Sequence, residues 1–561
     1  MTTVRATVGV DFGTESARAV LVDVATGREI ASAVHEYKSG VIDDHLPGHG
    51  QILPSDWALQ DPDDYLESLG MTVKAVLAQS RIDPTQVVGI GIDFTACTMM
   101  PVTDDGTPLC RLGDHRSNPH SWVKLWKHHA AQPEADLINA TAESRGEPWL
   151  DRYGRKTSSE WFFAKALQIL DEAPEIYAHA DRLIEAADWI IWQLTGVETR
   201  NSTTAGYKAL WSKQNGFPER QFFSALNPGF ADVIDEKMSR EIANPGERAG
   251  GITPFAANLT GLVPGTAVAV ANVDAHVSVP AATVVSPGRL VAVMGTSTCH
   301  IALADVDLVV PGVCGVVEDG VVPGLFGYEA GQAAVGDMFG WFAGLVTGTD
   351  KPTGKTHQLL EQEAAMLAPA ESGLVAIDWW NGNRSVLVDA DLTGLLMGTT
   401  LSTRRGEIYR ALLEATVFGT RVIIEAMETA DVRIDEIVAC GGLPFQNKLL
   451  MQLTADITGR PVRVAESRQT PALGSAMFAA VAAGPELGGY ESILEASSAM
   501  ARLGDDEYLP TASAGQIYDD LYEIYRSLHD SLGAESSEMR RLHSLQERVR
   551  SLSPQRTKVQ A

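Results

Sequence analysis

Residues that could hold phosphate gather in one tight turn near the start of the sequence. An alternating apolar run leads to Asp11, Gly13, Thr14 and Ser16, and a second alternating run leaves the turn and reaches Asp23. This pattern predicts a β-hairpin. Gly13 lets backbone N–H groups approach phosphate oxygens, Thr14 and Ser16 can donate hydrogen bonds, and Asp11 can hold a cation or its water. Gly-Thr turns between strands are usually only turns, so a second observation is needed.

A second copy of the pattern lies about half a chain further on. Within residues 289–305, Gly295, Thr296 and Thr298 repeat the spacing of the glycine and hydroxyl residues in the first turn. Two such hairpins, one at the start of each half, predict two similar domains that face each other across a nucleotide.

Two carboxylates follow runs that are typical of buried strands. Residues 87–94 are almost wholly apolar and lead through Asp93 to Ala96, and residues 266–273 lead to Asp274. Because ligands of open α/β sheets bind at the carboxyl ends of strands, we expect these three residues to line a cleft. A capping or loop-tying carboxylate is an equal interpretation of Asp93, and the N-cap of the next helix is the alternative for Asp274.

Two further segments carry side chains suited to a polyol. Residues 113–132 combine indoles, including Trp126, with lysines, and these could supply an aromatic surface and hydrogen-bond donors. The histidines among them do not have the spacing of a zinc site. Lys208 stands among small and aromatic residues, where an ammonium needs a partner or a ligand unless its side chain reaches solvent.

Length and composition limit the possible classes of protein. The 561 residues exceed one hydrophobic core, and the repeat favours two large lobes. A net charge of −28 argues against a general attraction to nucleic acid or anionic membranes. The scattered cysteines suit reduced thiols, and we see neither a charged leader before an apolar run nor a run near the ~20 apolar residues of a membrane span. We therefore expect a cytoplasmic protein without nucleic-acid or membrane partners.

Seven segments in chain order carry a resemblance that covers most of the sequence. They are GVDFGTESARAVLVD, GIDFTACTMMPV, DHRSNPHSWVKLWKHHAAQ, NVDAHVSVPAA, MGTSTCHIAL, GYEAGQAAVGDMFGWF and CGGLPFQNKLLMQLTADI. Together they resemble the FGGY carbohydrate kinase family of the actin and hexokinase superfamily. The KLWKHHAAQ, NVDAH and GYEAG blocks resemble the members of that family that phosphorylate L-ribulose.

The resemblance implies an α/β fold with two actin-like, ribonuclease H-like domains on either side of a nucleotide and sugar cleft. Residues 1–284 would form the N-terminal, sugar-binding domain, and residues 285–561 the C-terminal, ATP-binding domain with a helical tail. An apolar stripe along residues 539–552 predicts that this tail is amphipathic. The tail is either a loosely held end or a contact in a homodimer.

The resemblance also assigns sugar contacts and a catalytic base. Asp274 would be the base, while Lys208, Glu329 and the backbone at Ala96 would hold the sugar, with Asp93 and Trp126 as further candidates. We expect Glu329 at the head of a helix rich in small and aromatic residues, where a helix-initiating carboxylate is the structural alternative.

ATP with Mg²⁺ would lie between the two turns, and Asp11 would orient the metal or its water. A strand, Gly-Gly and helix start at residues 437–458 would bring backbone against the adenosine, although a plain turn has the same pattern. The expected nucleotide contacts are Asp11, Gly13, Thr14, Gly295, Thr296, Gly336, Gly441, Gly442 and Asn447.

The implied reaction is ATP-dependent phosphorylation of L-ribulose to L-ribulose 5-phosphate in L-arabinose catabolism. A family member that acts on xylulose, glycerol or ribitol would share the fold and the ATP site and differ only on the sugar side. An actin-like ATPase without a sugar substrate is the alternative of another class. Asp274 at a strand exit, with Lys208 and Glu329 available, argues against that alternative.

Overall fold

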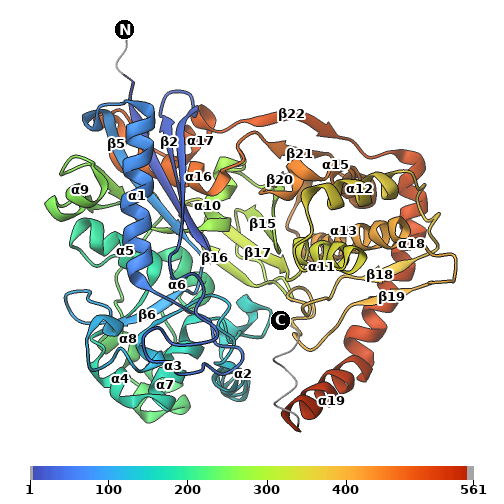
Figure 1. Cartoon of the computed structure of the whole chain (residues 1–561), viewed down its shortest axis with the longest axis horizontal. Helices are drawn as coiled ribbons and strands as arrows, with labels where there is room; N and C mark the ends of the chain where they lie inside the picture. The colour runs from blue at the N-terminus through green and yellow to red at the C-terminus, as the bar shows by residue number, and fades with distance from the viewer. Residues whose placement is uncertain (1–3, 553–561) are drawn as a thin grey trace.

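Two large mixed sheets organise the computed structural model, which describes residues 4–552 (Figure 1). The first has the order β11-β12-β5-β1-β2-β3, with β13 beside β5. Its strands are β1 (Ala6–Phe12), β2 (Ser16–Asp23), β3 (Glu29–Glu36), β5 (Val87–Phe94), β11 (Arg248–Gly251), β12 (Ala267–Ala269) and β13 (Asn272–Val273). The second has the order β16-β17-β15-β14-β20-β21-β22. Its strands are β14 (Gly288–Met294), β15 (Thr298–Ala304), β16 (Gly315–Glu318), β17 (Phe326–Gln332), β20 (Ile434–Cys440), β21 (Val462–Ala465) and β22 (Leu503–Tyr508).

Both sheets contain the same strand arrangement. β1 pairs antiparallel with β2 and parallel with β5, and β14 pairs antiparallel with β15 and parallel with β20. Further out, β3 and β17 are antiparallel neighbours of β2 and β15, while β12 and β21 are parallel neighbours of β5 and β20. The repeated turn in the sequence therefore belongs to a repeated α/β domain, and the predicted two-domain α/β fold is confirmed.

Both predicted hairpins and the strand at residues 87–94 are confirmed. Every residue of β1 and β5 is buried, as expected for central strands of a sheet covered on both faces. The first turn is closed by the Gly13 N–H, which donates to Ser16 O at 3.0 Å. The second is closed one residue earlier, by the Gly295 N–H, which donates to Ser297 O at 2.9 Å.

Two helices, α10 (Asp274–Ala281) and α16 (Thr470–Leu487), pack against each other between the sheets (Figure 1). α16 lies across β1 and β5 of the first sheet. Gly9 and Gly91 permit this approach, because a Cβ would lie 1.8 Å from Ala472 O at Gly9 and 2.0 Å from Ser475 O at Gly91. All strands of the first sheet precede residue 284 and those of the second follow it, yet α16 packs back on the first sheet. The boundary at residue 284 stays a prediction.

A helical region is inserted into the first domain, mostly between β5 and β11, and forms the lower left of Figure 1. It surrounds a small sheet of β4 (Leu59–Gln60), β6 (Met99–Val102), β7 (Val123–Lys124) and β8 (Arg182–Glu185). Its helices are α2 (Gln132–Arg145), α3 (Phe162–Glu172), α4 (Pro174–His179), α6 (Ser202–Lys208), α7 (Arg220–Leu226) and α8 (Val233–Lys237), while α5 (Ala186–Thr195) packs on the first sheet. α1 (Pro62–Ser80) and α9 (Pro254–Thr260) complete this half.

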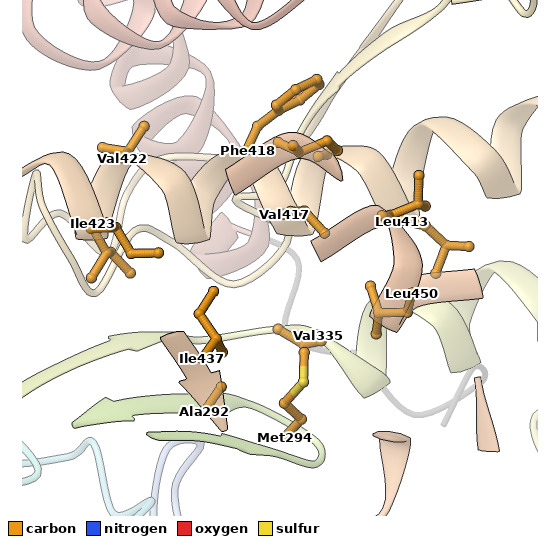
Figure 2. Packing of buried hydrophobic residues seen from close by; sticks show 14 of the residues in the cluster. Ala292, Met294, Val335, Leu413, Val417, Phe418, Val422, Ile423, Ile437 and Leu450 are labelled. Carbon is orange, nitrogen blue, oxygen red and sulfur yellow. The ribbon is translucent and has the colours of Figure 1, made fainter. Parts of the chain in front are cut away.

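Helices of the second domain cover its sheet on the right of Figure 1. They are α11 (Gly336–Thr347), α12 (Gly354–Ala365), α13 (Arg405–Thr429), α14 (Leu443–Gln446), α15 (Lys448–Thr458) and α18 (Ala512–Asp530). α17 (Ile493–Met500) packs instead on α16 and α10, and α19 (Glu538–Leu552) is the last helix of the chain that the structure describes. Figure 2 shows Val417 and Ile423 of α13 on the side of that helix that faces Ala292 and Ile437 of the sheet. Among residues 4–552 no helix combines the length and the apolar character needed to cross a membrane.

The predicted amphipathic tail helix is present as α19. Leu542, Leu545 and Val549 are exposed on it, while Met539 packs against the core of the second domain. Its part in a homodimer stays a prediction.

Candidate active site

Three carboxylates come together where β1, β5 and β13 end. Asp11 and Asp93 are directly opposite each other on the parallel strands β1 and β5. Asn272 of β13 is the partner of Asp93 on the other side, and Asp274 follows β13 as the first residue of α10. The sheet thus brings together three acids that are far apart in the sequence, at the edge where ligands of such sheets bind.

The environment of Asp274 makes its carboxyl group an unusually weak acid. Desolvation, followed by the negative charge of Asp11, raises the pKa of Asp274 to about 7. A hydrogen bond from the Ala275 N–H at 2.7 Å and the charge of Lys208 act in the opposite direction. Near neutral pH, Asp274 can therefore both accept and release a proton, as a general base must.

Asp93 has a structural role through one carboxylate oxygen, and its other oxygen has no hydrogen-bond partner. Its Oδ2 accepts a hydrogen bond from Ser475 Oγ at 2.6 Å, which ties β5 to α16. Its Oδ1 is buried without a hydrogen-bond partner. Burial and then the charge of Asp11 raise the pKa of Asp93 well above its usual value. A buried oxygen without a donor suits a cation or a hydrogen-bonding ligand.

The acids Asp11 and Asp93 fit a hydrated Mg²⁺ that arrives with a nucleotide. Mg²⁺ usually binds one or two carboxylates, keeps several waters and takes phosphate oxygens as its other ligands. Asp11 is only loosely paired, with its Oδ2 3.5 Å from an Arg18 nitrogen. Residues 4–552 contain no group of three His, Cys, Asp or Glu side chains that could hold a metal without such added ligands.

A buried ion pair connects the two domains beside this acid cluster. Lys208 Nζ, at the end of α6, donates to both oxygens of Glu329 on β17, at 2.9 and 3.1 Å. His276 Nε2, on α10, lies 3.3 Å from Glu329 Oε2. One residue before Lys208, the Tyr207 hydroxyl donates to Gly327 O at 2.8 Å, so α6 is held on β17. The pair presents an ammonium and a carboxylate, the groups that bind sugar hydroxyls.

Both members of this pair are charged. Burial by itself would raise the pKa of Glu329, but Lys208 and His276 outweigh burial and lower it well below its usual range. Burial would lower the pKa of Lys208, and the Glu329 carboxylate raises it instead. Both side chains are at least nine-tenths shielded from solvent. Lys208 therefore has a partner within the protein, one of the alternatives that the sequence left open.

The expected helix position of Glu329 is wrong, because this residue lies in strand β17 and the helix begins only at Gly336. The glycines and alanines of this segment suggested a small-residue helix. β17 is instead fixed by pairing with β15 and β16, where Glu329 is opposite Ile301 and Gly315. This pairing is long-range, so local sequence could not indicate it.

The loops that carry Ala96 and Trp126 are held by one ammonium. Lys165 of α3 is fully buried, and its Nζ donates to Cys97 O and Leu125 O, both at 2.7 Å. The Trp126 indole donates to Thr14 Oγ1 at 3.0 Å. Trp126 therefore contacts the first phosphate turn, and the sugar-side loops are linked to that turn.

The glycines predicted on the nucleotide side allow close packing around the second turn. The Gly336 N–H donates to Gly295 O at 3.1 Å, so α11 begins against that turn. A Cβ on Gly336 would lie 2.6 Å from Gly295 O. Gly441 has a φ of 91°, and its Cβ would lie 2.5 Å from Met294 O. The adjoining Gly442 is exposed at the start of α14.

Asn447 is used within the protein. It is buried, and its Oδ1 accepts a hydrogen bond from the Leu450 N–H at 2.8 Å as the N-cap of α15. The cap positions α15 behind the Gly-Gly turn. A contact between Asn447 and a nucleotide stays a prediction.

Two family models together match most of the chain. The N-terminal domain of the FGGY family of carbohydrate kinases matches residues 6–279, and the C-terminal domain matches residues 290–483. The chain belongs to this family. Carbohydrate kinases are phosphotransferases, so the predicted family and enzyme class are confirmed.

Individual relatives cover this FGGY kinase almost from end to end. A protein named ribulokinase from Halalkalibacterium halodurans is 54% identical over 550 residues, which are 97% of this chain and 98% of the relative. A ribulokinase from Geobacillus thermodenitrificans is also 54% identical over 550 residues, with 97% of each chain covered. The crystal structure of a xylulose kinase from Rhodospirillum rubrum superposes with a TM-score of 0.77 at 22% identity, covering 94% of this chain and 99% of that one. That likeness supports the fold alone.

The structure of this FGGY kinase adds two residues near Glu329 that the sequence did not single out. His276 contacts Glu329, as described above. Arg384, between β18 (Val375–Ile377) and β19 (Leu395–Met397), has a terminal nitrogen 3.9 Å from Glu160 Oε1 of the first domain. Its Cδ would lie 2.9 Å from a Cβ on Gly331, so its side chain lies over β17. A lone arginine in a loop has no periodicity, and no sequence signal could have found it.

Proposed function

We propose that this chain transfers the γ-phosphoryl group of ATP to L-ribulose, giving L-ribulose 5-phosphate and ADP. The observation that carries the proposal is the buried Lys208–Glu329 pair at the domain junction, close enough to Asp274 that both charges act on the pKa of Asp274. An actin-like ATPase without a small substrate has no use for a buried ion pair beside a base. The ribulokinase names of relatives at 54% identity support L-ribulose as the sugar.

In the proposed complex, the turns at Gly13–Thr14 and Gly295–Thr296 hold the ATP phosphates from opposite sides. Asp11, with the free oxygen of Asp93, would hold a hydrated Mg²⁺, which neutralises phosphate charge when bound. Gly336 and Gly441 let α11 and the end of β20 pack closely against the second turn.

Asp274 orients the terminal hydroxyl of the sugar and takes its proton. The hydroxyl oxygen forms a bond to the γ-phosphorus, the bond from that phosphorus to the β,γ-bridging oxygen breaks, and ADP leaves with the electron pair. The attacking hydroxyl loses its proton late in phosphoryl transfer, so orientation by a residue fixed at a strand end is the main contribution. Lys208, Glu329 and the backbone at Ala96 hold the remaining sugar hydroxyls.

The first test is ADP release from the purified protein with ATP and Mg²⁺. The acceptors to compare are L-ribulose, D-ribulose, D-xylulose, glycerol, ribitol and none. We expect L-ribulose to give the highest kcat/KM. A higher value for another polyol would keep the chemistry and change the substrate, and a rate that ignores every acceptor would support the actin-like ATPase. With L-ribulose as substrate, the enzyme would act in L-arabinose catabolism in the cytoplasm.

We further propose that Arg384 closes the sugar site from the second domain. Arg384→Met is expected to raise KM for the sugar about tenfold and leave KM for ATP unchanged, since hydrogen bonds to charged groups contribute ~1.5–3 kcal/mol. The matched control is Arg433→Met, because the Arg433 side chain is 77% exposed and pairs only with Asp435 among the described ion pairs. Steady-state kinetics would measure both constants. A change confined to ATP would contradict the assignment.

A further inference from the structure

A cavity of about 550 Å³ that is wide open to solvent lies apart from the acid cluster, on another part of the domain junction. Its walls come from the chain segment between α10 and β14, from α17, and from β21 and β22 at the edge of the second sheet. The residues that matter here are Thr283, Arg463, Leu494, Ser498, Arg502 and Leu503. Cavities of 300–1,000 Å³ are typical of sites for small molecules.

The lining of this cavity is basic in a strongly acidic protein. It includes the arginines Arg463 and Arg502 and no Asp or Glu. Within the part of the chain that the structure describes, neither arginine has a carboxylate within 4.0 Å, although the whole chain has a net charge of −28. Two guanidinium groups without counter-charges therefore face one cavity.

Both guanidinium groups are held in place by backbone carbonyls. Arg463 donates to Gly504 O at 3.2 Å, and its Nε is buried without a hydrogen-bond partner. Arg502 donates to Ser498 O at 3.2 Å and to Ala501 O at 2.6 Å. The carbonyls fix the side chains without neutralising them, and the unpaired Nε of Arg463 is a donor that lacks an acceptor.

We propose that this cavity is a second ligand site, for a phosphomonoester. The phosphate would lie between Arg463 and Arg502, because the planar guanidinium matches phosphate oxygens with paired donors. Leu494 and Leu503 offer an apolar wall for the organic part, and Ser498 lies beside the guanidinium of Arg502. The site is separate from the phosphate turns and does not depend on which sugar the enzyme phosphorylates.

The position of the cavity links its ligand to both domains. Thr283 lies in the segment that joins them and has a φ of 63°, and Arg289 of β14 donates to Thr283 O at 2.9 Å. α17 packs on α10 and α16 between the sheets, whereas Arg463 belongs to the second sheet. A bound phosphomonoester would therefore contact the connecting segment and the second sheet together.

The test is isothermal titration of the full-length protein with inorganic phosphate, D-ribose 5-phosphate and AMP in separate arms. A saturating concentration of the sugar that the acceptor comparison identifies as substrate, together with a non-hydrolysable ATP analogue, keeps these probes out of the catalytic site. We expect saturable binding of at least one phosphomonoester, and the arms identify whether sugar, nucleoside or phosphate alone suffices. Absence of saturable binding in all three arms would overturn the proposal.

Variants then locate the site. Arg463→Met and Arg502→Met are each expected to weaken binding at least tenfold, and the exposed control Arg433→Met is expected to leave it unchanged. Arg463→Lys and Arg502→Lys keep the charge but lose the paired donors, so we expect each to weaken binding at least threefold. These lysine variants test the site if the methionine variants do not fold. Equal binding by wild type and the lysine variants would contradict a guanidinium site. Unchanged turnover of L-ribulose by these variants would show that the catalytic site is intact.

Discussion

Asp274→Asn is expected to reduce sugar-dependent ADP release about a thousandfold while ATP and sugar still bind. A positioned general base contributes roughly 10²- to 10⁴-fold to a rate, and asparagine keeps the shape of the side chain but cannot accept the proton. Initial rates with L-ribulose would give kcat, and titration calorimetry would give the two affinities. Residual turnover within tenfold of wild type would remove Asp274 as the base.

The same residue predicts a pH dependence. Desolvation and the charge of Asp11 raise the pKa of Asp274 to about 7, so its carboxyl group is protonated below this pH and cannot act as a base. We therefore expect kcat/KM of the wild type to rise with pH through about 7 and to level off above it. A rate that stays flat from pH 5 to 8 would contradict the assignment.

Asp378→Asn is the matched control for Asp274→Asn. Asp378 is also a buried aspartate whose pKa is raised by desolvation. Its oxygens accept hydrogen bonds from Gln332 and from the Tyr525 hydroxyl, at 2.8 Å each, and it is not one of the acids around Asp274. We expect this variant to retain kcat. That result would show that the loss of a buried carboxylate elsewhere in the protein does not stop phosphoryl transfer.

Glu329→Gln is expected to weaken both the sugar site and the protein. The amide leaves the buried Lys208 ammonium without a counter-charge, and breaking a buried pair in this way costs about 3–5 kcal/mol. Because the pKa of Glu329 is lowered in the folded protein, the stability that it contributes is complete above its unfolded value of ~4.3 and is lost as pH falls toward the folded value. We expect at least a tenfold loss of sugar affinity and unchanged ATP affinity. Urea unfolding at pH 7 and calorimetry would measure these effects.

A double-mutant cycle separates the pair from its members. Lys208→Met combined with Glu329→Gln is expected to cost less unfolding free energy than the sum of the two single changes, because neither charge is then buried alone. Agreement of the sum within ~0.5 kcal/mol would exclude a coupled pair. The control is Asp235→Asn, which removes a carboxylate from the exposed pair with Arg240 and should cost no more than ~1 kcal/mol.

Sequence patterns of short range predicted much of this protein. Alternating apolar residues around a Gly-Thr turn indicated both hairpins, since side chains in a strand alternate between two faces and only small residues fit the turn. The continuous apolar run at residues 87–94 indicated a buried parallel strand, and its end placed Asp93 at the ligand edge. The repeat of the turn after half the chain indicated two related domains. The hairpins and the strand depend only on neighbours in the chain, and each copy of the repeat can be recognised locally.

Only the tertiary structure decided which of these residues act together. Glu329 is in a strand because β15 and β16 pair with it, and its partner Lys208 is 121 residues away. The pKa of Asp274 comes from burial and from the charge of Asp11, which belongs to another strand. Periodicity records which face of an element is apolar, whereas burial, charge and pairing depend on what other elements bring to that face. The sequence by itself therefore determined the hairpins, the buried strand and the family, whereas the packing of distant elements decided the strand that carries Glu329 and the site as a whole.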